Sequence, residues 1–111
     1  MDEGQAVQGF AALAQETRLA VLKLLVKAGP EGVAAGAIGS SLGMQPSRTS
    51  FHLAQLERAG LIVSRRESRS VIYSASYAQL TSLIQFLMED CCAGDPRIVS
   101  GCAPIIAKCA C

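Results

Sequence analysis

The first third of the chain has apolar residues at helical spacing. They lie on one side of Gln5–Ala14 and over most of the circumference of Thr17–Ala28, so we expect an amphipathic helix followed by a central, buried one. Gly29-Pro30 ends the second helix, because glycine and then proline commonly follow helix ends. We interpret the apolar side chains of both helices as core. In the first helix these are Val7, Phe10, Leu13 and Ala14.

The middle of the chain predicts a helix-turn-helix unit. A short helix over Val33–Leu42 is followed by the link Gly43-Met44-Gln45 and by a helix that opens at Pro46, a residue suited to a first turn. The stretch Pro46–Ile62 has polar residues in its first two turns and apolar anchors behind them. These anchors are Phe51, Leu53, Leu56 and Leu61. We expect this helix to pack by its back and to present a polar front.

Two strands and a basic tip follow this helix. Leu61–Ser64 and Val71–Ser74 are rich in branched and aromatic residues, which favours a two-stranded hairpin. The segment Arg65–Ser70 between them is polar and basic. A hairpin directly behind such a helix is a wing, and it must lean on the helices because isolated hairpins are marginally stable in water.

A last helix is expected from Ser76 to about Asp90. Ser76 and Gln79 fit a capping box, in which serine is followed three residues later by glutamine. Its broad apolar stripe consists of Leu80, Leu83, Ile84, Leu87 and Met88. A small winged domain has little left to cover this stripe, so we expect it to pair with the first helix and with its copy in a two-fold dimer. The alternative is that it folds back onto its own core.

Length and charge narrow the class of protein. A chain of 111 residues is one domain, and oligomerisation would help to stabilise it. No apolar run is long enough for a bilayer span and the start is acidic, so we expect a soluble cytoplasmic protein with no membrane partner. The net charge is +1, but Met44–Ser76 holds five arginines against two glutamates. This segment predicts a double-stranded DNA partner, although ordinary solvated arginines would give the same count.

Two groups of residues are candidates for DNA contact. The first lies at the exposed start of the second helix of the unit, where side chains can reach base edges, and comprises Gln45, Ser47, Arg48, Thr49 and Ser50. Arg48 suits guanine because its forked donors match two acceptors, whereas the hydroxyls could equally cap the helix. For His52 we expect packing or a phosphate contact ahead of base contact. The second group would hold phosphates from the wing and comprises Arg65, Arg66 and Arg69.

Three stretches point to a known family. Glu16–Leu19, Ser50–Leu53 and Leu56–Ile62 resemble the ArsR family of small winged-helix repressors, also called ArsR/SmtB, over roughly Ala6–Leu87. The resemblance implies a homodimer whose recognition helices enter successive major grooves of an operator and which leaves the DNA when an inducer binds. The expected fold is mostly α with a small β-hairpin, a homodimeric winged helix-turn-helix. Residues 1–90 would form its DNA-binding and dimerisation domain, and residues 91–111 a cysteine-rich inducer-binding tail.

All five cysteines lie after residue 90, which is not the distribution of a secreted disulfide scaffold. Thiolates are soft ligands, and trivalent arsenic or antimony takes three of them, so we expect As(III) or Sb(III) as inducer. Cys91 and Cys92 can supply two ligands, and Cys102 can return as the third because closing a loop of about ten residues costs modest entropy. Cys109 and Cys111 are alternates, and with the first pair they could instead form a four-thiolate zinc, cadmium or lead site.

The positions of these cysteines match one type within the family. The widespread cysteine pair before the recognition helix is missing from Ala37–Leu42, and the acidic and histidine zinc ligands of other members are missing from the last helix. The chain is similar to members with an adjacent cysteine pair near the end of the last helix and a third cysteine downstream. We therefore expect a metalloid-responsive transcriptional repressor that leaves operator DNA when trivalent arsenic or antimony binds its thiolates.

Two alternatives for the tail stay open. Adjacent thiols could form a redox switch on the same repressor scaffold. Cys91 and Arg97 also have the Cys-x5-Arg spacing of low-molecular-weight arsenate reductases and thiol phosphatases. Such loops connect a strand to a helix, whereas Cys91 follows a predicted helix and Pro96 removes an amide donor. We therefore do not expect an enzyme.

Overall fold

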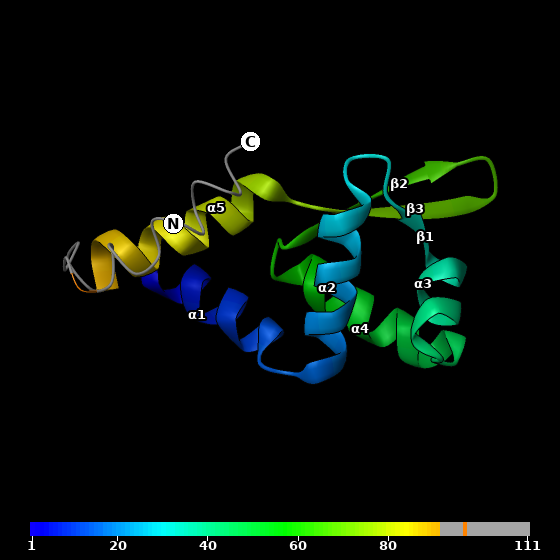
Figure 1. Cartoon of the computed structure of the whole chain (residues 1–111), viewed down its shortest axis with the longest axis horizontal. Coiled ribbons are helices and arrows are strands. Elements are labelled where there is room, and N and C mark those ends of the chain that lie inside the picture. The colour runs from blue at the N-terminus through cyan, green and yellow to red at the C-terminus, as the bar shows by residue number, and fades with distance from the viewer. Residues whose placement is uncertain (92–96, 98–111) are drawn as a thin grey trace.

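The computed structural model describes residues 1–91 and residue 97, and within them five α-helices accompany a three-stranded antiparallel sheet (Figure 1). The elements in chain order are α1 (Glu3–Leu13), α2 (Glu16–Ala28), β1 (Val33–Ala34), α3 (Ala35–Leu42), α4 (Pro46–Arg58), β2 (Ile62–Glu67), β3 (Ser70–Ala75) and α5 (Tyr77–Gln85), which continues as a π-helix (Phe86–Cys91). This order confirms the predicted winged helix-turn-helix. The helix pair α1 and α5 lies at one end of the molecule, and α3 and the hairpin lie at the other (Figure 1).

The sheet is larger than the predicted hairpin. Strands β2 and β3 pair from Ile62 opposite Ala75 to Glu67 opposite Ser70, so the arginine-rich segment is mostly strand and the turn is two residues long. Ser68 in that turn has a φ of 55°, the left-handed conformation that tight hairpin turns favour. The short strand β1 pairs with the other side of β3. The sequence placed these two β1 residues in a helix, because a two-residue strand has no periodicity to detect.

The link between α3 and α4 is as predicted. Gly43 has a φ of 65°, the left-handed backbone that glycine adopts readily after a helix, and the Met44 amide donates to the Gly39 carbonyl at 2.9 Å. Pro46 occupies the first turn of α4, where its missing amide proton costs nothing. These local signals fix the turn of the helix-turn-helix unit.

The core joins the sheet to α2, α3 and α4. Its fully buried large side chains are Val21, Leu25, Ile38, Leu53, Leu56, Leu61 and Ile62. Three of the four predicted anchors behind α4 are therefore confirmed. The fourth was wrong, because the side chain of Phe51 is 56% exposed.

The prediction for the first helix was right for Leu13, which packs against the core, and wrong for Val7, Phe10 and Ala14. Val7 is 60% exposed and Phe10 is exposed as well, whereas Ala6, Gly9 and Ala12 face inward. A Cβ atom on Gly9 would lie 2.9 Å from the methyl carbons of Leu83, so α1 and α5 approach closely at this point (Figure 1). Small residues allow that approach, and the larger apolar side chains of α1 turn away from it.

The last helix is only partly covered. Ser76 accepts a hydrogen bond from the Gln79 amide at 3.3 Å, which confirms half of the capping box, while the Ser76 amide donates instead to the Leu61 carbonyl. Leu83 is buried, but Ile84 and Leu87 are 53% and 45% exposed. Folding back onto its own domain therefore leaves part of the apolar stripe in solvent.

Two polar side chains of α4 point inward, which contradicts the expected DNA contact of Thr49 but agrees with the packing role expected as one alternative for His52. Thr49 is 3% exposed, lies against Gly39 of α3, and donates from its hydroxyl to the Gln45 carbonyl at 3.1 Å. His52 is 6% exposed, and its Nδ1 has no hydrogen-bond partner among the described residues. Burial lowers the pKa of His52, and the positive charges of Arg18 and Arg48 lower it further. His52 is therefore a neutral packing residue.

The contact between α3 and α4 can be tested with two glycines on one helix. A Cβ atom on Gly39 would lie 2.8 Å from Thr49 Oγ1, whereas one on Gly36 would meet nothing within 4 Å. We expect Gly39→Ala to lower the free energy of unfolding by about 1–3 kcal/mol, as overpacking does. Gly36→Ala should raise it by up to about 1 kcal/mol through helix propensity. Urea unfolding measures both, and equal effects would contradict the close packing.

The buried histidine predicts a pH dependence of stability. Its folded pKa lies below its ordinary value of 6.5, so between these two values the unfolded chain binds a proton that the folded chain does not. The contribution of neutral His52 to the free energy of unfolding is therefore fully present above pH 6.5. It should decrease as the pH falls below 6.5, by at most about 1.4 kcal/mol per pH unit. The comparison is urea unfolding of the unmodified chain and His52→Gln from pH 5 to pH 8. If the chain gained stability relative to the variant in acid, His52 would not be held neutral.

Candidate nucleic-acid interface

The exposed front of α4 differs from the predicted one. Gln45, Ser47, Arg48 and Ser50 are exposed as predicted, and the first turn of α4 has no side-chain capping bond. The serine hydroxyls are thus not engaged in capping the helix and stay available for another partner. Since Thr49 is buried, it leaves the set of residues that can reach DNA.

Phe51 lies on the exposed front of α4, whereas Thr49 and His52, which were candidates for that front, are buried. Ser47, Ser50, Phe51 and Ala54 are all exposed and recur at the three- and four-residue spacing of one helix face. An exposed phenylalanine on such a face can contact the methyl group of thymine. Sequence reasoning missed it because an aromatic residue beside leucines was assigned to the core. The angular position of residue 51 relative to the buried residues 49, 52, 53 and 56 was the signal that could have found it.

The base of the wing is held by hydrogen bonds to the rest of the fold. Arg65 donates from Nε to Glu67 at 3.1 Å and from its Nη atoms to the carbonyls of Pro30 and Glu31. Ser64 donates to the Glu57 carboxylate of α4 at 2.7 Å. Arg65 therefore has a structural role that its sequence position did not indicate, although its side chain is still 42% exposed.

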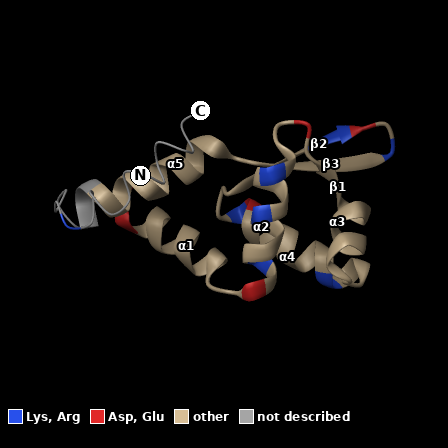
Figure 2. Ribbon diagram, viewed as in Figure 1, with Lys and Arg blue, Asp and Glu red and all other residues tan. Residues whose placement is uncertain are grey.

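The other two arginines of the wing are exposed. Arg66 lies near the end of β2 and Arg69 in the turn, and neither has an ion-pair partner among the described residues. Basic residues at the start of α4 and along the hairpin lie toward the same end of the molecule, away from α1 and α5 (Figure 2). This end presents a helix front flanked by positive charge, the arrangement that suits a major groove and its phosphates.

The predicted thiolate site falls almost entirely outside the described residues. Cys91 is the last residue of the π-helix, and the described part of the chain does not include Cys92, Cys102, Cys109 and Cys111. Within the described part, no three histidine, cysteine or acidic residues form a group that could hold a metal ion. The three-thiolate site remains a prediction. Because Cys91 ends a helix, it lacks the preceding strand that a Cys-x5-Arg phosphate loop needs.

No helix within the described ranges is long and apolar enough to cross a membrane.

Known proteins are similar to this chain in sequence and in fold. The family described as "Helix-turn-helix domain" matches residues 13–65. The transcriptional activator HlyU of Vibrio cholerae serotype O1 is 33% identical over 86 residues, which cover 78% of this chain and 77% of HlyU. A structure of reduced HlyU has a TM-score of 0.61 at 32% identity and covers 77% of this chain and 86% of that one.

Two further structures carry the family name. An ArsR-like transcriptional regulator from a Rhodococcus species has a TM-score of 0.70 at 25% identity, covering 90% of this chain and 92% of that one. The homodimeric winged helix-turn-helix domain of a possible ArsR-family regulator from Mycobacterium bovis has a TM-score of 0.63 at 29% identity, covering 87% and 84%. Fold, DNA-facing geometry and sequence identity agree. The chain belongs to the ArsR family of winged helix-turn-helix transcriptional regulators.

Proposed function

We propose that this chain is a homodimeric repressor that binds operator DNA and releases it when trivalent arsenic or antimony binds its C-terminal thiolates. The observation that supports DNA binding is the exposed, uncapped front of α4 beside a basic wing. The front comprises Gln45, Ser47, Arg48, Ser50 and Phe51, and the phosphate contacts come from Arg66 and Arg69. Named transcriptional regulators among the relatives support a regulatory rather than an enzymatic role.

Dimerisation is supported by the apolar side chains left exposed on α1 and α5. Val7 and Phe10 on α1, with Ile84 and Leu87 on α5, are all more than a third exposed. These helices lie side by side at the end of the molecule away from the wing (Figure 1). A two-fold contact through this end would cover the apolar residues and leave both recognition helices free, and the Mycobacterium bovis relative is homodimeric.

The inducer proposal depends on the chemistry and position of the cysteines. Adjacent Cys91 and Cys92, with Cys102 as third ligand, offer the soft donors that trivalent arsenic or antimony prefers. Cys91 directly continues the helix that begins as α5. A metalloid bound there would act on a helix of the proposed dimer contact, so it could favour one relative position of the two recognition helices.

A thiol redox switch on the same scaffold is the second candidate. HlyU, which is 33% identical to this chain, has a structure described as reduced, so an oxidation state is specified for that relative. Adjacent Cys91 and Cys92 give this chain two thiols of the kind that oxidants modify. The two candidates differ in what releases the DNA.

The base-contacting role of α4 can be separated from phosphate binding. We expect Phe51→Ala to weaken binding to an operator selected from random duplexes by about 1–3 kcal/mol, and to reduce discrimination at one base pair, because it removes an apolar base contact. Its salt dependence should stay unchanged. Arg69→Ala should do the reverse, lowering the slope of log affinity against log salt by about one while keeping the discrimination. Fluorescence anisotropy measures both, and unchanged discrimination in Phe51→Ala would remove Phe51 from the interface.

The inducer is tested by DNA release in the presence of a strong phosphine reductant. We expect arsenite or antimonite to release DNA from the unmodified chain and from Cys109→Ser/Cys111→Ser, but not from a chain with Cys91, Cys92 and Cys102 all replaced by serine. The reductant keeps the thiols reduced, so release under these conditions is not oxidation. Arsenite-triggered release from the triple variant would sink the assignment. Release by peroxide alone, without reductant, would favour the redox candidate.

A further inference from the structure

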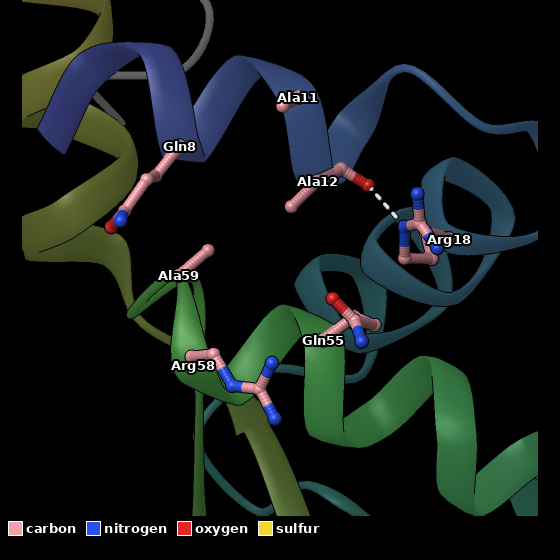
Figure 3. A pocket seen from close by; sticks show the side chains of 7 residues that line it. All are labelled: Gln8, Ala11, Ala12, Arg18, Gln55, Arg58 and Ala59. Carbon is pink, nitrogen blue, oxygen red and sulfur yellow. Dashed lines mark hydrogen bonds between the residues drawn. The ribbon is translucent and has the colours of Figure 1, made fainter. Parts of the chain in front are cut away.

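A pocket of about 280 Å³ opens between α1, α2 and the end of α4 (Figure 3). Its polar side chains come from all three helices: Gln8 from α1, Arg18 from α2, and Gln55 and Arg58 from α4. The rest of its wall is formed by three alanines. Neither the DNA contacts nor the thiolate site uses these residues.

The lining of the pocket has positive charge and no acidic residue. Its lining contains two guanidinium groups and no carboxylate. In the part of the chain that the structure describes, neither Arg18 nor Arg58 makes an ion pair. A concave site lined by one sign of charge concentrates ions of the opposite sign. The charge therefore selects an anion.

Arg18 is already oriented for a ligand. Its Nε donates to the Ala12 carbonyl at 2.6 Å, as the dashed line in Figure 3 shows. This bond fixes the guanidinium plane and leaves the Nη1 and Nη2 groups for a further acceptor. A donor that is held before the ligand arrives loses less conformational freedom on binding.

We propose that this pocket binds a small organic carboxylate as an effector. A guanidinium group pairs with a carboxylate through two parallel hydrogen bonds, and the amides of Gln8 and Gln55 can donate to remaining oxygens. The alanine methyl groups offer contact to a short carbon skeleton. The volume lies just below the roughly 300–1,000 Å³ typical of drug-sized ligands, which favours an anion smaller than a nucleotide.

The position of the pocket gives such a ligand an effect on α4. A carboxylate that contacts both Arg18 and Arg58 would bridge α2 to the recognition helix, and would stabilise the orientation of α4 in which both contacts form. The consequence for DNA affinity rests on the proposed function, whereas binding of the anion does not.

Anion binding is measured first, without DNA, by isothermal titration calorimetry of the full chain with acetate, succinate and benzoate. Inorganic phosphate and sulfate at equal ionic strength are the comparison arms. We expect at least one carboxylate to saturate, and Arg58→Gln to weaken it by about tenfold or more, because a charged hydrogen-bonding group is lost. Lys27→Gln, which removes an exposed positive charge outside the pocket, should leave the carboxylate affinity unchanged. Thermal unfolding checks that both variants are folded.

Three results would overturn the proposal. They are affinity that is unchanged in folded Arg58→Gln, no saturation by any carboxylate below about 10 mM, and saturation by phosphate or sulfate alone. DNA affinity is then measured with and without the bound carboxylate. A change that Arg58→Gln abolishes supports the effector role, and no change overturns that role. Absence of DNA binding in every condition would contradict the proposed function instead, while the calorimetry would still report on the pocket.

Discussion

The packing of one face of α4 against α2 and α3 determines what the rest of the molecule can present. Gly39 admits Thr49 at a distance that leaves no room for a methyl group, and His52 is buried on the same side of α4. The angular spacing of side chains around a helix is fixed, so burying Thr49 and His52 places Ser50 and Phe51 on the exposed side of α4. The identity of the outward residues is thus a consequence of the core.

Much of the architecture could be predicted because its signals are local. Gly43 and Pro46 bound the turn between α3 and α4 through their own backbone preferences, and the branched residues after residue 60 predict the wing without reference to anything distant. The family resemblance added the DNA-binding role, which sequence identity and fold now support. The dimer contact and the metalloid remain proposals, since they involve a second copy and residues beyond the described ranges.

The errors share a physical cause, which is that tertiary contacts decide burial and strand pairing where side-chain polarity and local pattern do not. Thr49 is buried because its hydroxyl finds an acceptor in the preceding turn, so the core pays no desolvation penalty for it. Val7 and Phe10 are exposed because α1 turns Gly9 toward Leu83 of α5 and buries Ala6 and Ala12. Strand β1 exists only through its pairing with β3, a long-range contact that no local window contains. Each of these outcomes depends on tertiary contacts.

The bonds from Arg65 to the Pro30 and Glu31 carbonyls have a thermodynamic consequence for the wing. A two-stranded hairpin projecting from a domain would normally sample many orientations, and a partner would have to select one of them at an entropic cost. Here the guanidinium fastens the hairpin to the segment that follows α2, and Ser64 fastens it to α4. Arg66 and Arg69 are thus held at a set separation from the recognition helix in the free protein. The spacing between the proposed groove contacts of α4 and the proposed phosphate contacts of the wing is therefore a property of the fold.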